Sequence, residues 1–306
     1  MNKSLYIVIA GIVIVAGFVG YTLFGKEEAV HTAGDGHTDH SLDNVDTESM
    51  NADHMGVTTG ATLEGTRVIL KNSALKAGNQ NVSFELYGKD GHVFGDAELK
   101  ITHEKKMHFI MVSNDFSDYQ HVHPEYKDKL WQVQAAFKTN TAYQAYVDIE
   151  SDEDGVETLR VPLTIGTPQT VSKVVQKETT LAKDGIEVRM SPENGFVVGK
   201  ENAVIFTLSR GGKNIVPENY LGAKGHVVAL GDDPNTFVHG HPDDHGDSEI
   251  HFAFSLERAG TYTLFAQFQV GGVVRTYPFT VTVTSGAGNT SNTDESKPHT
   301  DTVPHN

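Results

Sequence analysis

Between about residues 63 and 284 the chain consists of short segments in which apolar and polar residues alternate. Residues 81–87 and 261–268 are examples, rich in Val, Phe, Tyr, Leu and Thr, and each is followed by a turn that contains glycine. Alternation with a period of two is typical of β-strands, and turns about every ten residues are typical of an all-β sandwich. Helical periodicity is hardly visible here. The pattern therefore predicts an all-β fold.

A break in this pattern predicts two domains. Residues 166–168, Gly-Thr-Pro, end one apolar strand, and Gly185 precedes the next. With 306 residues, the chain is long enough for two domains of ordinary size, each with its own core. We therefore predict tandem β-sandwich domains at residues 63–168 and 169–284.

The N-terminus has a different pattern. Residues 5–24 are an uncharged apolar run, of the roughly 20 residues that a helix needs to cross a bilayer. Residues 1–25 are therefore predicted to be a membrane helix or a signal peptide. The run ends in large residues such as Tyr21, which favours an uncleaved anchor. Lys3 favours a cytoplasmic start, so we expect a single-pass protein of the cell membrane with extracytoplasmic C-terminal domains.

Two polar segments flank the predicted sandwiches. Residues 26–62 and 285–306 lack an apolar period, which predicts a disordered linker and a disordered tail. The linker is rich in His, Asp and Met, a mixture that can capture copper, although the same residues also fit a solvated spacer. Its histidines and methionines are His31, His37, His40, His54, Met50 and Met55.

The composition restricts the chemistry. The chain has no cysteine, which excludes disulfides, thiolate metal sites and a cysteine nucleophile. Its formal net charge is −16, so it should repel nucleic acid and attract cations. It contains no P-loop, dinucleotide fingerprint, Gly-x-Ser-x-Gly or His-Glu-x-x-His motif. Any metal must therefore be held by nitrogen, oxygen or thioether sulfur.

One histidine pattern occurs twice. Each copy has a histidine, twelve intervening residues, a histidine, one residue, a histidine and a proline. With one inserted residue the similarity continues, since Trp131 aligns with Ile250 and Tyr143 with Tyr262. Packing alone does not explain three polar residues kept in register, so we predict an internal repeat with one metal site in each copy. The histidines are His108, His121 and His123 in the first copy and His226, His239 and His241 in the second.

The spacing has a geometric meaning. Residues i and i+2 of a strand share a face, so the last two histidines of each copy point the same way. A hairpin with an even-numbered loop puts the first histidine opposite one of them, whereas an odd-numbered loop turns it to the other face. The proline would end the strand and leave the cluster at a partly exposed margin. The alternative is that these histidines fix a corner of the sandwich through backbone hydrogen bonds.

The second copy has further candidate ligands. His245 and His251 follow it within ten residues, so we include both and expect the second site to bind more tightly. Imidazole sites follow the general divalent order with copper above zinc, so ligand type alone does not select the ion. Copper is the predicted ion, with zinc left open. His92 and His103 are predicted to be surface residues.

Residues 107–124 and 220–242 resemble the YtkA-like, immunoglobulin-like domains of bacterial secreted or membrane-anchored proteins, and the resemblance covers most of residues 65–284. It implies an immunoglobulin-like fold and an association with heavy-metal handling. More loosely, a cysteine-free sandwich with His and Met ligands is similar to CopC-type periplasmic copper carriers, whose methionine-rich loop this chain lacks.

These observations predict a non-enzymatic extracytoplasmic protein that captures or buffers copper. A copper transporter or another envelope protein would be a suitable partner. One alternative is a copper- or zinc-dependent enzyme with an open coordination position, but no candidate acid–base residue recurs in both copies. The other is a structural or adhesion module whose histidines serve only the fold.

Overall fold

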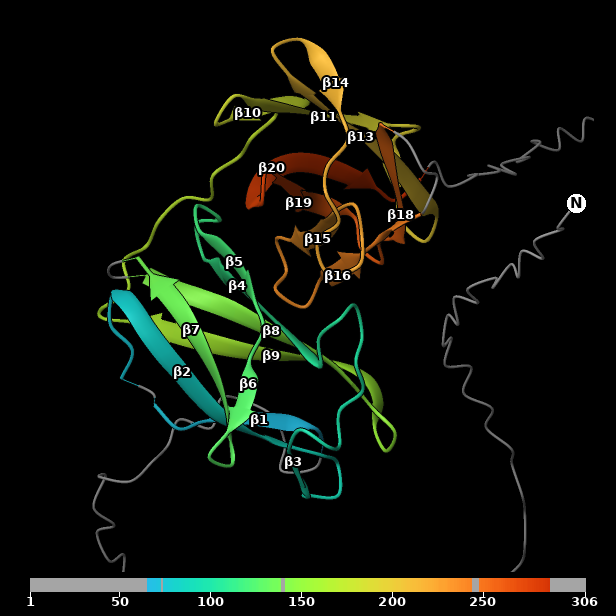
Figure 1. Ribbon diagram of the computed structural model, residues 1–306. Helices are drawn as coiled ribbons and strands as arrows, with labels where there is room; N and C mark the ends of the chain where they lie inside the picture. The colour runs from blue at the N-terminus through green and yellow to red at the C-terminus, as the bar shows by residue number, and fades with distance from the viewer. Residues whose placement is uncertain (1–64, 73, 139–140, 244–247, 287–306) are drawn as a thin grey trace, which may run out of the picture. The chain divides into compact units, whose positions relative to one another are not determined.

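The computed structural model describes residues 65–286 except residues 73, 139–140 and 244–247. The predicted anchor and linker and most of the predicted tail lie outside the described residues. Every regular element in the described part of the chain is a strand (Figure 1). No helix among these residues is long and apolar enough to cross a membrane. The described residues all belong to one compact unit, Ala52–Asn306.

The first half of the described chain forms two antiparallel sheets. Its strands are β1 (Arg67–Leu70), β2 (Gly78–Tyr87), β3 (Val93–Phe94), β4 (Met107–Ser113), β5 (Tyr119–Val122), β6 (Glu125–Lys127), β7 (Leu130–Phe137), β8 (Thr141–Ser151) and β9 (Gly155–Ile165). One sheet has the order β1-β2-β7-β6, with β3 beside β2, and the other has the order β5-β4-β8-β9. We call this half the first sandwich.

The second half repeats this arrangement. Its strands are β10 (Thr180–Lys183), β11 (Ile186–Pro192), β12 (Phe196–Val197), β13 (Glu201–Arg210), β14 (Lys213–Ile215), β15 (His226–Gly231), β16 (Phe237–Gly240), β17 (Pro242–Asp243), β18 (Glu249–Ser255), β19 (Gly260–Val270) and β20 (Val273–Thr284). The sheets have the orders β10-β11-β13-β18-β17, with β14 beside β13, and β12-β20-β19-β15-β16. Strand by strand, β4, β5, β7 and β8 correspond to β15, β16, β18 and β19. We call this half the second sandwich.

Each sandwich has its own hydrophobic core. Phe84, Phe109 and Trp131 are buried in the first core, and Phe206 and Phe279 are buried in the second. The alternating burial along β2 and β13 matches the alternating sequence, because one face of each strand points into the core. The all-β sandwich predicted from the sequence is confirmed.

Strands β4 and β15 depart from this alternation, because all their residues are buried. One face of each strand packs in its own core. The other face contributes to a third apolar cluster that draws on both sandwiches, so it is buried as well. This cluster contains Ile110, Val112 and Tyr146 from the first sandwich and Val228, Leu230 and Phe265 from the second. The first histidine of each repeat lies on this second face, next to the apolar cluster.

Candidate metal centre

The two hairpins have the same register. Ile110 pairs with His121 in the first, and Val228 pairs with His239 in the second. The last pairs of the two hairpins enclose residues 113–118 and 231–236, so both connections are even-numbered, which is the case in which the histidines share a face. Continuing the register by two residues places His108 opposite His123, and the same step places the first histidine of the second hairpin opposite its third. All three imidazoles of each hairpin therefore share a face.

The two hairpins bring their histidines into one cluster. Ring centroids are 5.3 Å apart for His108 and His239, and 5.9 Å apart for His121 and His226. Within the second hairpin, the centroids of His226 and His241 are 5.0 Å apart. The sequence predicts one separate site in each copy, and the structure differs. The reason is that the sandwiches bury the histidine-bearing faces of β4 and β15 against each other.

Burial also differs from the expectation of a partly exposed strand margin. The exposed fraction is 1% for His108, 8% for His121 and 0% for His226. The predicted exposure was wrong for these three residues, because a face that is outer in one sandwich becomes inner when the two sandwiches pack together.

Two groups of three histidines have the spacing of metal ligands. His108, His121 and His239 form one group, with one ligand nitrogen from each residue within 4.8 Å of the others. His226, His239 and His241 form the second group by the same measure. His239 belongs to both, so the groups overlap. His123 is in neither group, although its ring centroid is 5.0 Å from those of His108 and His121.

Backbone carbonyls fix the first histidine of each repeat. His108 Nε2 lies 3.0 Å from the carbonyl oxygen of Thr102, and His226 Nε2 lies 2.8 Å from that of Tyr220. A carbonyl oxygen only accepts hydrogen bonds, so Nε2 carries the proton and Nδ1 keeps a lone pair. Thr102 and Tyr220 each lie six positions before their histidine, so the repeat preserves this contact.

The second histidine of each repeat is fixed by the other sandwich. His239 Nδ1 donates to Asp148 Oδ2 at 3.1 Å, and His121 Nδ1 donates to Gln267 Oε1 at 2.9 Å. Asp148 pairs with His108 across the sheet, and Gln267 pairs with His226, so the two acceptors occupy equivalent positions. Each contact leaves Nε2 of the histidine with its lone pair. Metal-ligating histidines commonly have an acceptor of this kind behind the ring.

Imidazole nitrogens that carry no proton face one another in the cluster. His108 Nδ1 and His121 Nε2 are 3.0 Å apart, and in the tautomers described above neither carries a proton. Two nitrogens that each lie 2.0–2.1 Å from one ion are about 2.9–3.4 Å apart, so this pair has the spacing of two ligands of a single ion. Four more imidazole nitrogens are buried without a hydrogen-bond partner among the described residues. They are His123 Nε2, His226 Nδ1, His239 Nε2 and His241 Nε2.

Burial keeps the cluster neutral. It lowers the pKa of His226 to about 4, of His123 to about 3 and of His241 to about 2, and it lowers the pKa of the other three histidines as well. Neutral imidazole is the form that binds a metal. Burial raises the pKa of Asp148 to about 6, and a hydrogen bond from Thr158 opposes this shift. At pH 7 the cluster is therefore a set of neutral donors beside one carboxylate.

The other two predicted ligands do not join the cluster among the described residues. His251 lies in β18 between the buried Ile250 and Phe252, so alternation turns its side chain to the outer face of the sheet. Its Nε2 is 3.7 Å from a carboxylate oxygen of Glu249. His245 lies outside the described residues.

The sequence analysis missed three residues that contribute to the cluster. Asp148 and Gln267 were detectable, because the alignment that matches Tyr143 with Tyr262 also matches this pair. His103 is exposed, as predicted for a surface residue, but it also stacks on His241, with ring centroids 3.4 Å apart and an interplanar angle of 17°.

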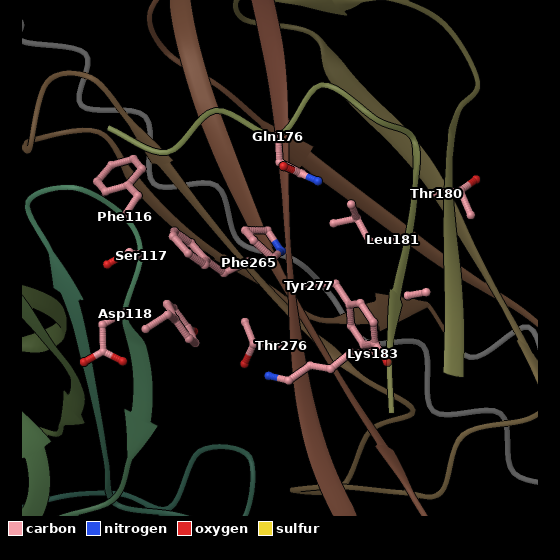
Figure 2. A pocket seen from close by; sticks show the side chains of 13 residues that line it. Phe116, Ser117, Asp118, Gln176, Thr180, Leu181, Lys183, Phe265, Thr276 and Tyr277 are labelled. Carbon is pink, nitrogen blue, oxygen red and sulfur yellow. The ribbon is translucent and has the colours of Figure 1, made fainter. Parts of the chain in front are cut away.

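Three hollows show where ligands can approach the described part of the chain. One, of about 370 Å³, is lined by His103, His108, Asp148, His239 and His241, so it reaches the cluster. Another, of about 560 Å³, has Asp118 and Lys183 on opposite sides of an aromatic lining that includes Phe265 and Tyr277 (Figure 2). Its lining contains none of the histidines. A third hollow, of about 530 Å³, is lined by His121, His123 and Glu125, so it reaches the cluster as well.

These features define a tandem β-sandwich protein with a buried histidine cluster that could hold metal. The chain belongs to the family of the domain of unknown function DUF8832, whose model matches residues 61–166 and again residues 179–285. This double match confirms the internal repeat. No curated protein matches the chain.

Several solved structures are similar to this chain. An activated alpha-2-macroglobulin from Escherichia coli has 7% identity and a TM-score of 0.23, with coverage of 72% of this chain and 16% of that one. An ICAM-5 ectodomain fragment has 15% identity and a TM-score of 0.21, with coverage of 71% and 53%. A putative membrane anchored protein from Corynebacterium diphtheriae has 8% identity and a TM-score of 0.21, with coverage of 72% and 59%.

The chain thus spans less than two thirds of each of these proteins, and TM-scores this low carry no argument about function. The resemblance to CopC-type carriers receives no support from the comparisons.

Proposed function

We propose that the paired sandwiches capture or buffer copper outside the cell membrane. The observation that carries this proposal is the set of imidazole nitrogens whose lone pairs face one another, each left free by a hydrogen bond on the other side of the ring. Imidazole suits copper and zinc, and copper binds more tightly in the general divalent order. The overlap of the two groups at His239 favours one tightly held ion per chain over the two expected from the sequence.

The setting agrees with this proposal. The strand orders β1-β2-β7-β6 and β5-β4-β8-β9 correspond to the A-B-E-D and C′-C-F-G sheets of an immunoglobulin-like domain, as the resemblance to YtkA-like proteins implies. Residues 1–25 would anchor the chain, and the net charge of −16 would concentrate cations near it. A copper transporter in the same membrane would be a suitable partner.

A purely structural role for the histidines explains less. Buried polar atoms in native proteins nearly always have hydrogen-bond partners, and an unsatisfied one costs about 1–3 kcal/mol. Four imidazole nitrogens of the cluster lack such partners among the described residues. An ion held by His226, His239 and His241 would satisfy three of them.

Elemental analysis tests the proposal. The whole chain would be purified without an affinity tag, with His31, His37, His40 and His54 replaced by alanine so that the linker binds no copper. We expect about one copper per chain after dialysis against excess copper and zinc, and none after His226→Ala with His239→Ala. A chain that retains no metal, or a double variant that retains it fully, would contradict the proposal. Retention of zinc alone would contradict the choice of copper.

A further inference from the structure

One turn holds the first histidine of each repeat. In residues 102–105 the backbone pairs Thr102 with Lys105, and in residues 220–223 it pairs Tyr220 with Ala223. Both central residues have positive φ in each copy, which is the geometry of a type I′ turn. The first residue of each turn accepts the hydrogen bond from the cluster histidine. Both copies therefore share this turn.

The second position of this turn differs between the copies. It is His103 in the first sandwich, with a φ of 48°, and Leu221 in the second, with a φ of 52°. Leucine therefore satisfies the same turn, and the fold does not require an imidazole there. His103 has no hydrogen bond to any described residue in the structure, so a role in holding the turn does not account for it.

His103 lies at the edge of the histidine cluster. It is exposed, whereas the cluster histidines are buried or half-buried. Its ring is stacked on His241, and its centroid is 6.1 Å from that of His108 and 6.5 Å from that of His226. It also lines one of the two hollows that reach the cluster, the one that contains Asp148 and Glu150, whose carboxylates favour an approaching cation.

We infer that His103 is the transfer ligand through which a transition-metal ion passes between solvent and the buried cluster. This inference rests on the proposed function. A hydrated ion cannot reach buried nitrogens until it has lost water, and each lost water must be replaced by another donor. An exposed imidazole in contact with His241 supplies that donor in the lining of the hollow. The ion keeps its charge throughout, and water is released as imidazole binds.

Such a ligand has a distinct kinetic signature. It stabilises the barrier between the free and the bound ion, so it speeds entry and exit by the same factor and leaves the dissociation constant unchanged. A resident ligand would instead slow dissociation and strengthen binding. The two roles can therefore be separated by measuring both rate constants.

Stopped-flow measurements on the whole chain, in the background with the four linker histidines replaced, test this role. The probes are Cu²⁺ alone for association and a chelator in excess for dissociation. His103→Leu copies the residue found in the second sandwich, and His103→Asn is a second variant, because asparagine tolerates positive φ. His251→Leu is the matched control, since it removes a histidine from the outer face of β18.

We expect both rate constants to fall about tenfold in the two His103 variants, equivalent to about 1.4 kcal/mol at the barrier, with the dissociation constant within about twofold of the parent. His251→Leu should leave both rates unchanged. Unchanged rates in the His103 variants would overturn the inference while the proposed function stands, and so would weaker binding at an unchanged association rate. If the parent chain binds no copper, the proposed function fails and this inference fails with it.

Discussion

The two sandwiches share one framework but differ in the groups that surround the histidines. The hairpin register, the turn before it and the carbonyl that fixes the first histidine are the same in both. The acceptor behind the second histidine differs, since Asp148 serves His239 and Gln267 serves His121. A carboxylate raises the basicity of its imidazole more than an amide does, so His239 should be the stronger donor.

The same asymmetry recurs around the cluster. The first sandwich has His103 and Tyr119 where the second has Leu221 and Phe237. The first copy therefore supplies an extra polar group at the site, His103, and another in the apolar cluster between the sandwiches, Tyr119. The sequence had predicted the richer site in the second copy. What the second copy contributes instead is His239, which belongs to both ligand groups.

The largest expected effect distinguishes the two second histidines. His239→Ala removes a ligand from both groups, whereas His121→Ala, at the equivalent position, removes one from a single group. We expect copper affinity to fall by more than about 100-fold in the first variant, beyond the range typical for loss of an outer hydrogen-bond partner, and by about tenfold in the second. Competition titration with a chelator of known affinity would measure both.

Equal losses in these two variants would show that the repeats bind independently, one ion each, as the sequence predicted. His123→Ala is the control within the cluster. It lies in neither group, so its effect should be the smallest of the three.

The next effect concerns the two acceptors. Asp148→Asn keeps an oxygen for His239 but removes the charge, and we expect affinity to fall by about 10-fold to 100-fold. Gln267→Glu places a carboxylate behind His121, and we expect affinity to rise. Calorimetric titration at pH 7.5 would measure both. A fall in both variants would mean that exchange at either position disturbs packing, and that the difference in charge does not set affinity.

Much of the framework could be predicted from the sequence. Alternation with a period of two predicted the sandwiches, and the constant spacing of the histidines predicted the repeat and, on condition of an even-numbered hairpin loop, their shared face. These features depend on local geometry, which a strand imposes wherever it lies. The outward direction of His251 could have been predicted in the same way, because burial alternates along β18 and His251 lies between two buried residues.

The merging of the sites could not be predicted in this way. Whether His108 and His226 face solvent or each other depends on which sheet faces the sandwiches bury together. That is decided by contacts between residues far apart in the sequence, such as Tyr119 with Phe265. The uninterrupted apolar run 109–112 was a sign that β4 is buried on both faces. This run did not show that the second sandwich covers the outer face of β4.

The next largest expected effect is a fall in the free energy of unfolding at acid pH. Burial lowers the pKa of His226 from the unfolded value near 6.5 to about 4, so between these values the unfolded chain binds a proton that the folded chain does not. The free energy of unfolding without metal should therefore fall with pH in this window, by about 2 kcal/mol at pH 5 from this residue alone. Urea unfolding at pH 7.5 and 5 would measure the loss.

Asp148 should partly offset that loss. Its folded pKa of about 6 lies above the unfolded value, so below pH 6 the folded chain takes up a proton there more readily than the unfolded chain does. Asp148→Asn, which makes this position neutral like Gln267, should steepen the dependence. A loss of stability that is identical in this variant would show that the carboxylate does not titrate in this range.

The smallest effect compares two aromatic pairs between the sandwiches. Tyr119 stacks on Phe265, and at the equivalent positions Phe237 stacks on Tyr146, with centroids 4.5 Å and 4.6 Å apart. The Tyr146 hydroxyl donates to the carbonyl oxygen of Pro234 at 2.9 Å. The Tyr119 hydroxyl is buried without a hydrogen-bond partner among the described residues. The same substitution should therefore act with opposite signs at the two positions.

Tyr119→Phe copies the second sandwich and removes a polar atom that is buried at a cost, so we expect the free energy of unfolding to rise by about 1 kcal/mol. Tyr146→Phe removes a satisfied hydrogen bond and should lower it by about 1 kcal/mol. Urea unfolding of the metal-free chain at pH 7.5 would measure both, each variant serving as the control for the other. If Tyr119→Phe lowers stability as much as Tyr146→Phe does, its hydroxyl has a partner in solution, and the asymmetry of the interface is confined to the histidines.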